Sequence, residues 1–144
     1  MPPIGREIAA AAKALDRAFS AALAEAGGSL PVWLILLSLK QRHWPTQQDL
    51  AAAVGIEGPT LTHHLDGMES AGLIVRARDD RDRRAVRVEL TAEGEARFLA
   101  LRDAAVAFDA RLRDGVSHEE TDMLRDLLAR LRENVGGAVP TGRP

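Results

Sequence analysis

The spacing of apolar side chains changes once along the chain, and this change restricts the fold more than any other feature. In residues 4–26, apolar side chains recur at steps of three or four, which places them on one face of an α-helix. In residues 85–90, apolar and charged side chains alternate instead, as in a strand with one buried face. Helical spacing returns after residue 91. The sequence therefore predicts a mainly α chain with one small β element.

Glycine, proline and capping residues divide the first part of the chain into four predicted helices. Residues 32–39 are apolar on nearly every side, so the second helix should lie at the centre of the domain. The third helix covers residues 46–53 and the fourth covers residues 58–71, with a turn at Gly55 between them. The start signals are Ser29 with Pro31, Thr46 with Asp49, and Pro59, and the stop signals are Gly27, Pro45 and Gly72.

A β-hairpin follows the fourth helix. Residues 73–78 and 85–90 are its predicted strands, and the polar run at 79–84 is the turn between them.

Two more helices complete the chain. Thr91 caps a long helix that ends at Gly115, and Ser117 with Glu120 forms a capping box that opens the last helix. The sequence contains no internal repeat and no long linker, so we expect a single domain. Its predicted extent is residues 1–144, with a core at about 30–91 and flanking helices at about 4–26 and 92–135.

Composition excludes several kinds of chemistry. The 144 residues include no cysteine, so disulfides, thiolate catalysis and cysteine zinc sites are excluded. The four histidines lack metal-site spacing, and we find no paired carboxylates, nucleophile–base set or glycine-rich phosphate loop. We therefore expect no cofactor, no metal and no enzymatic activity. No apolar run approaches the roughly 20 residues that span a bilayer, which favours a cytoplasmic protein without a membrane partner.

The distribution of charge matters more than its sum. A net charge of −2 is unusual for a nucleic-acid-binding protein. Residues 76–87, however, contain six arginines and three aspartates, so a local basic segment lies on a mildly acidic body.

The short helix pair and the charged hairpin together predict a winged helix-turn-helix. The helix pair alone is weak evidence, because many helical proteins contain such a corner. On residues 58–71, Thr60, Thr62 and His63 face away from the predicted core and can reach base edges or phosphates. A solvated polar face is the alternative interpretation. The hairpin tip, Asp82-Arg83-Arg84, has an arginine suited to a minor groove and an aspartate that can hold a guanidinium, although a salt-bridged surface turn is the alternative.

A set of short motifs occurs between residue 50 and residue 94. They are Gly55-Ile56, Pro59-Thr60-Leu61-Thr62, Leu65-Asp66, Met68-Glu69, Gly72-Leu73-Ile74, Asp82-Arg83-Arg84, Leu90-Thr91 and Glu93-Gly94. Through these residues, the sequence resembles the MarR (multiple antibiotic resistance regulator) family, and the helices before and after this stretch have the order and lengths that the resemblance requires.

The resemblance implies a DNA-binding transcriptional regulator that works as a homodimer. Its N- and C-terminal helices would interlock, and it would bind a palindromic operator, often as a repressor released by a small-molecule effector. The implied roles are major-groove contact for Thr60, Thr62 and His63, minor-groove insertion for Arg84, shaping of the wing by Asp82 and Arg83, and an ion pair between Asp66 and Arg76 that supports the wing.

An effector pocket is also implied, near the junction of the DNA-binding part and the dimer helices. Trp33, His43 and Trp44 are its candidate residues, although a core position is the simpler interpretation of Trp33.

Three residues depart from the family pattern. Glu57 replaces the usual Ser or Thr cap, while Gly58 and His63 occupy positions where long polar side chains are frequent. These departures lower the expected affinity for DNA phosphates, and His63 introduces a pH-sensitive group. They also leave open a different class of function, a winged-helix module for protein–protein assembly without a physiological DNA site.

Overall fold

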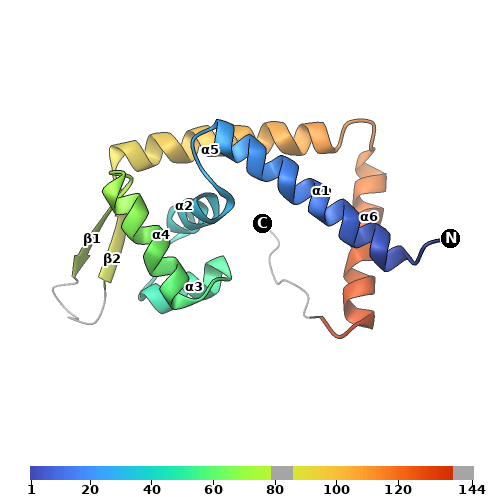
Figure 1. Cartoon of the computed structure of the whole chain (residues 1–144), viewed down its shortest axis with the longest axis horizontal. Helices are drawn as coiled ribbons and strands as arrows, with labels where there is room; N and C mark the ends of the chain where they lie inside the picture. Colours follow the sequence, from blue (N-terminus) through green and yellow to red (C-terminus); the bar gives the residue numbers. More distant parts are fainter. Residues whose placement is uncertain (79–85, 138–144) are drawn as a thin grey trace. The chain divides into compact units, whose positions relative to one another are not determined.

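The computed structural model describes residues 1–78 and 86–137. Its elements follow the predicted order of four helices, a hairpin and two helices (Figure 1), so the predicted fold class is confirmed. They are α1 (Ile4–Glu25), α2 (Leu30–Gln41), α3 (Gln47–Val54), α4 (Gly58–Ser70), β1 (Ile74–Arg78), β2 (Val86–Leu90), α5 (Ala92–Leu112) and α6 (His118–Asn134). The described residues form two compact units, one up to Phe108 and one from Asp109 onward, and the boundary between them falls inside α5.

The core of the first unit is built around α2, as its apolar composition predicts. Ile35 and Leu36 are fully buried there, and Trp33 of the same helix stacks on Phe98 of α5 with ring centroids 5.7 Å apart. The other helices of the unit, β1 and the residue before β1 also contribute buried side chains to this cluster: Leu23, Leu50, Ala51, Leu61, Leu65, Met68, Leu73, Ile74 and Leu101.

Local hydrogen bonds explain why the short helices begin and end where they do. The Ser29 hydroxyl accepts from the backbone N–H of Val32 at 3.3 Å, and the Thr46 hydroxyl accepts from that of Asp49 at 3.1 Å. Each bond satisfies a backbone donor that has no partner within the helix. Gly55 ends α3 in the left-handed conformation at φ 83°. Glycine adopts this conformation without steric cost, so the chain can turn directly into α4.

The hairpin is anchored at its base. β1 and β2 pair antiparallel, with Ile74 opposite Leu90 at one end and Arg78 opposite Val86 at the other. Ile74 is 1% exposed, whereas the residues nearest the open end are half-buried or exposed. The hairpin therefore extends from the core while its base remains part of it.

A close backbone approach joins α4, β1 and α5. Thr91 uses its backbone N–H to bond the carbonyl of Leu73, and its hydroxyl donates to the carbonyl of Gly72 at 2.5 Å. The same hydroxyl accepts from the N–H of Gly94 at 3.0 Å and so caps α5. A Cβ on Gly94 would lie 2.0 Å from the Leu73 carbonyl oxygen. Only glycine permits this approach.

In the second unit, Ser117 and Glu120 form the predicted capping box at the start of α6. This helix buries none of its residues. Its apolar side chains recur at helical spacing and remain at least one-third exposed: Met123, Leu124, Leu127, Leu128 and Leu131.

Among the described residues, no single helix is both long and apolar enough to cross a membrane. α1 and α2 meet the criteria of length and composition only as a pair, and the pair is bent by 73°.

The Gly94 contact makes a testable prediction. Gly94→Ala should lower the free energy of unfolding by about 1–3 kcal/mol, because the new methyl group overlaps a backbone carbonyl that cannot move independently. Urea unfolding followed by circular dichroism measures the change.

Gly67→Ala is the matched control, since Gly67 is also helical but a Cβ there has nothing within 4 Å. It should leave stability unchanged or raise it by about 0.5–1 kcal/mol through helix propensity. Equal effects of the two substitutions would contradict the packing argument.

Candidate nucleic-acid interface

The two faces of α4 divide as the sequence predicts. Leu61 and Leu65 are fully buried, and Met68 is 2% exposed. Thr60, Thr62 and His63 are all exposed to solvent. The Thr62 hydroxyl donates to the Gly58 carbonyl at 3.1 Å, which leaves its oxygen lone pairs free to accept. The predicted reading residues therefore share one accessible polar surface.

His63 and His64 are neighbours with different surroundings. Their ring centroids lie 5.7 Å apart at an interplanar angle of 60°, and His64 is half-buried. Both line a cavity of about 410 Å³ beside α4. Asp66 and Arg97 are the charged residues of this cavity. The Arg97 guanidinium also donates to the carbonyl of Gly27.

An ion cluster joins α4 to the hairpin. The Arg76 guanidinium of β1 lies 2.5 Å from the Asp66 carboxylate and 3.3 Å from that of Glu69, so the structure brings the expected pair together. The hydrogen bond from Arg76 is the main reason why the pKa of Glu69 is lowered from its usual 4.5. Hydrogen bonds to Glu69 and then Asp66 raise the pKa of Arg76. The guanidinium thus fixes the direction of β1 relative to α4.

Glu69 is a member of this cluster that the sequence reasoning missed. It follows Asp66 by three positions, a spacing that places two side chains on the same face of a helix. This spacing is the feature of the sequence from which the position of Glu69 beside Asp66 could have been predicted.

In the described part of the hairpin, arginines lie near its open end. Arg78 and Arg87 are exposed, and Arg87 pairs with Glu89 at 3.1 Å. The predicted tip residues Asp82, Arg83 and Arg84 lie outside the described residues.

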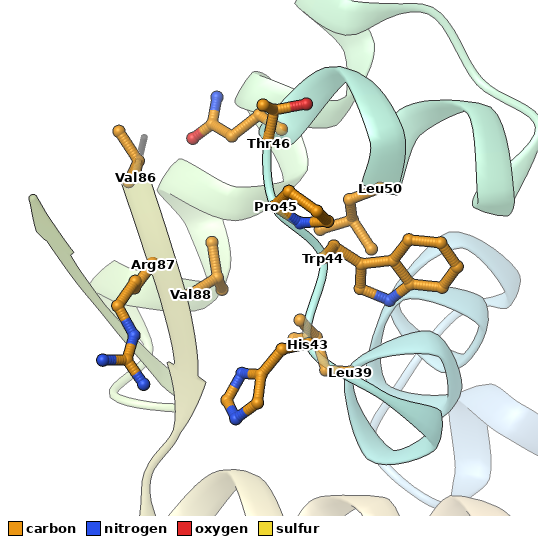
Figure 2. Close-up of a pocket in the computed structure, with 10 residues that line it drawn as sticks. Leu39, His43, Trp44, Pro45, Thr46, Leu50, Val86, Arg87 and Val88 are labelled. Atoms are coloured by element: carbon orange, nitrogen blue, oxygen red, sulfur yellow. The ribbon is translucent and has the colours of Figure 1, made fainter. Parts of the chain in front are cut away.

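The structure separates the three candidate pocket residues. His43 and Trp44 line a cavity of about 230 Å³ between the α2–α3 connection and β2, where Val86 and Val88 form the opposite wall (Figure 2). The His43 side chain extends towards β2, whereas the Trp44 indole lies against α2 (Figure 2). Trp33 does not line this cavity, because it is in the core against Phe98.

Trp44 is held in place by two contacts. Its indole N–H donates to the Ser38 carbonyl at 2.9 Å, and the Arg42 guanidinium lies 4.0 Å from its ring centroid. Both contacts restrict the ring, so this wall of the cavity is preformed.

The arrangement defines a winged helix-turn-helix. Two short helices meet at a glycine turn, the second presents a polar face, and a hairpin rooted in the core follows directly.

Comparison with known proteins gives the family. The model of the MarR family matches residues 29–86. The transcriptional regulator PA3341 is 32% identical, with 92% of this chain and 98% of that protein covered at a TM-score of 0.72. This chain therefore belongs to the MarR family and is a winged-helix transcriptional regulator.

Two further solved structures resemble the chain over most of its length. The transcriptional repressor CouR, bound to a 23-mer DNA duplex, is 26% identical, with 90% of this chain and 92% of that protein covered at a TM-score of 0.79. The M. tuberculosis regulator MOSR, in complex with DNA, is 25% identical, with 93% and 96% covered at a TM-score of 0.71.

The ion cluster predicts a change in the pH dependence of stability. Because the pKa of Glu69 is lowered in the folded state, its contribution is present above about pH 4.5 and is lost as pH falls through the lower value. Arg76→Gln should remove this contribution and make the fall in unfolding free energy between about pH 5 and pH 3 less steep. Urea titrations at several pH values test this.

Glu69→Gln should have the same flattening effect. Asp122→Asn removes an ion pair to Arg125 in which both side chains are more than 70% exposed, so it should leave the profile unchanged. An unaltered profile for Arg76→Gln would show that the cluster does not contribute.

Proposed function

We propose that this regulator binds double-stranded DNA sequence-specifically as a homodimer, with α4 in the major groove and the hairpin tip at the adjacent minor groove. The exposed polar face of α4, held against the hairpin by the Arg76 cluster, is the observation that carries this proposal. Thr60, Thr62 and His63 supply base and phosphate contacts, while Asp82, Arg83 and Arg84 form the wing.

The similar proteins support the same function. CouR and MOSR, both at least 25% identical to this chain, are each described in complex with DNA. CouR is a repressor. We infer that this chain also acts by occupying an operator.

Exposed apolar helices support the dimer. α6 leaves its leucine face exposed, and α1 exposes Ile4 and Leu15. A second copy of the chain would cover both faces across a twofold axis. In this arrangement, residues 30–91 form the DNA-binding core of a single MarR-like domain, and residues 4–26 and 92–135 form its dimerisation helices.

A twofold dimer determines the form of the operator. It would place the two α4 helices about 34–36 Å apart, one turn of DNA, and so recognise an inverted repeat. As a DNA-binding protein, it would act in the cytoplasm.

The cavity beside Trp44 is the proposed effector site. Its walls combine an aromatic ring, the His43 imidazole and aliphatic side chains from β2, which suits a small organic molecule with one polar group. Because β2 belongs to the hairpin, an occupant would contact both the helix-turn-helix and the wing. Ligand binding would thereby change operator affinity.

Fluorescence anisotropy with DNA from upstream of the gene tests the proposed function. Binding should be tight, should exceed that of a scrambled duplex and should weaken as salt rises. Arg84→Ala should weaken operator binding by about tenfold or more, because it removes a groove contact in each subunit.

Arg125→Ala removes the same charge from an exposed position on α6 and should bind like the wild type. Equal and weak binding to all duplexes, including those selected from random-sequence DNA, would contradict the proposal. That result would instead favour a winged helix used for protein–protein assembly.

A further inference from the structure

The helix-turn-helix of this chain contains no permanent positive charge. No lysine or arginine occurs from His43 to Val75, a stretch that includes all of α3 and α4. The same stretch contains four carboxylates, Asp49, Glu57, Asp66 and Glu69. Arg76 of β1 is shared between the last two. The surface that approaches the DNA is therefore acidic when its histidines are neutral.

Such a surface is repelled by the phosphate backbone, which normally supplies much of the affinity of a DNA-binding protein. The only side chains of this stretch that can gain a positive charge near neutral pH are its three histidines. His43 lies on the α2–α3 connection beside β2 (Figure 2). His63 and His64 lie on α4 itself.

His63 is placed to contact DNA, and His64 is less so. His63 is exposed together with Thr60 and Thr62, whereas His64 is half-buried. The charged or titratable groups that share the adjoining cavity are His64 and Asp66 from α4 and Arg97 from α5. The other surrounding elements contribute uncharged lining residues to this cavity, including Gly27, Val32 and Leu73.

We propose that His63 takes up a proton when α4 enters the major groove, and that operator binding is coupled to this proton. The imidazolium donates a hydrogen bond to an acceptor of the DNA, either a phosphate oxygen or the O6 and N7 edge of guanine. This inference rests on the proposed function, because it assigns the charge with which the proposed reading helix binds.

Protonation changes both the charge and the hydrogen bonding of the side chain. Neutral imidazole has one N–H donor, whereas imidazolium has two donors and a positive charge. Charge-assisted hydrogen bonds are about twice as strong as neutral ones. An imidazole that binds an anionic or electron-rich acceptor has a higher pKa in the complex than in the free protein. The added affinity is therefore fully present at low pH and is lost as pH rises through the pKa of the complex.

The size of the expected pH effect follows from the thermodynamic linkage between proton binding and DNA binding. Each unit by which the pKa rises on binding corresponds to as much as about tenfold in affinity per subunit. A dimer with two such histidines should therefore bind about tenfold or more tightly at pH 6 than at pH 8.

The experiment is fluorescence anisotropy from pH 6 to pH 8 at constant ionic strength. The probe is a duplex that the wild-type protein selects from random-sequence DNA at pH 6. His63→Gln should bind weakly and with little pH dependence. His63→Arg should bind more tightly than His63→Gln at pH 8, because its charge does not depend on a proton.

Two control variants distinguish His63 from its neighbour His64 and from a histidine of the second unit. His64→Gln should keep most of the wild-type pH dependence, and His118→Gln, on α6 in the second unit, should keep all of it. A His63→Gln protein with the wild-type pH dependence would overturn the proposal. So would a loss of pH dependence in His64→Gln alone.

The test separates this inference from the proposed function. Selection of a specific duplex whose affinity does not change with pH would overturn the role of His63 and leave the DNA-binding function intact. Failure to select any duplex would overturn both.

Discussion

The contact between Gly94 and the Leu73 carbonyl, with Thr91 beside it, is the constraint on which the rest of the DNA-binding unit depends. Thr91 donates its backbone N–H to the Leu73 carbonyl and its hydroxyl to the Gly72 carbonyl. The same hydroxyl accepts from the N–H of Gly94 and so caps α5. The end of α4, the start of β1 and the first turn of α5 therefore meet at one point. A larger residue at Gly94 would separate them. The direction in which the hairpin leaves the core is determined here, and the Arg76 cluster then orients the hairpin relative to α4.

In the proposed function, two elements share the chemistry of DNA binding. α4 presents hydroxyls and an imidazole, which discriminate by hydrogen bonding but supply no permanent charge. The arginines are concentrated in residues 76–87, on and around the hairpin. Arg76 pairs with Asp66 and Glu69, and Arg87 pairs with Glu89, whereas Arg78 is exposed near the open end of the described part of the hairpin. In that function, loss of the hairpin would remove most of the permanent positive charge of the DNA-binding surface, and changes in α4 would alter specificity and, at His63, affinity as well.

Local signals in the sequence predict most of the fold because each depends on a few adjacent residues. Ser29, Thr46 and Ser117 cap their helices as expected, and the alternation of residues 86–90 predicts β2. Contacts between distant residues are different. The bond from Thr91 to Gly72 spans 19 positions, and the stacking of Trp33 on Phe98 removes that indole from the proposed effector cavity. Neither depends on a periodic pattern, because tertiary packing decides which distant groups meet.

Methylation protection by dimethyl sulfate tests the central claim, that two copies of α4 read the major groove of one operator. Guanine N7 lies in the major groove and adenine N3 in the minor groove, so the reagent reports on both proposed contacts. We expect two clusters of protected guanine N7 whose centres lie about 10 base pairs apart, with protected adenine N3 beside each. Unprotected guanines at a bound operator, or a single protected cluster, would contradict it.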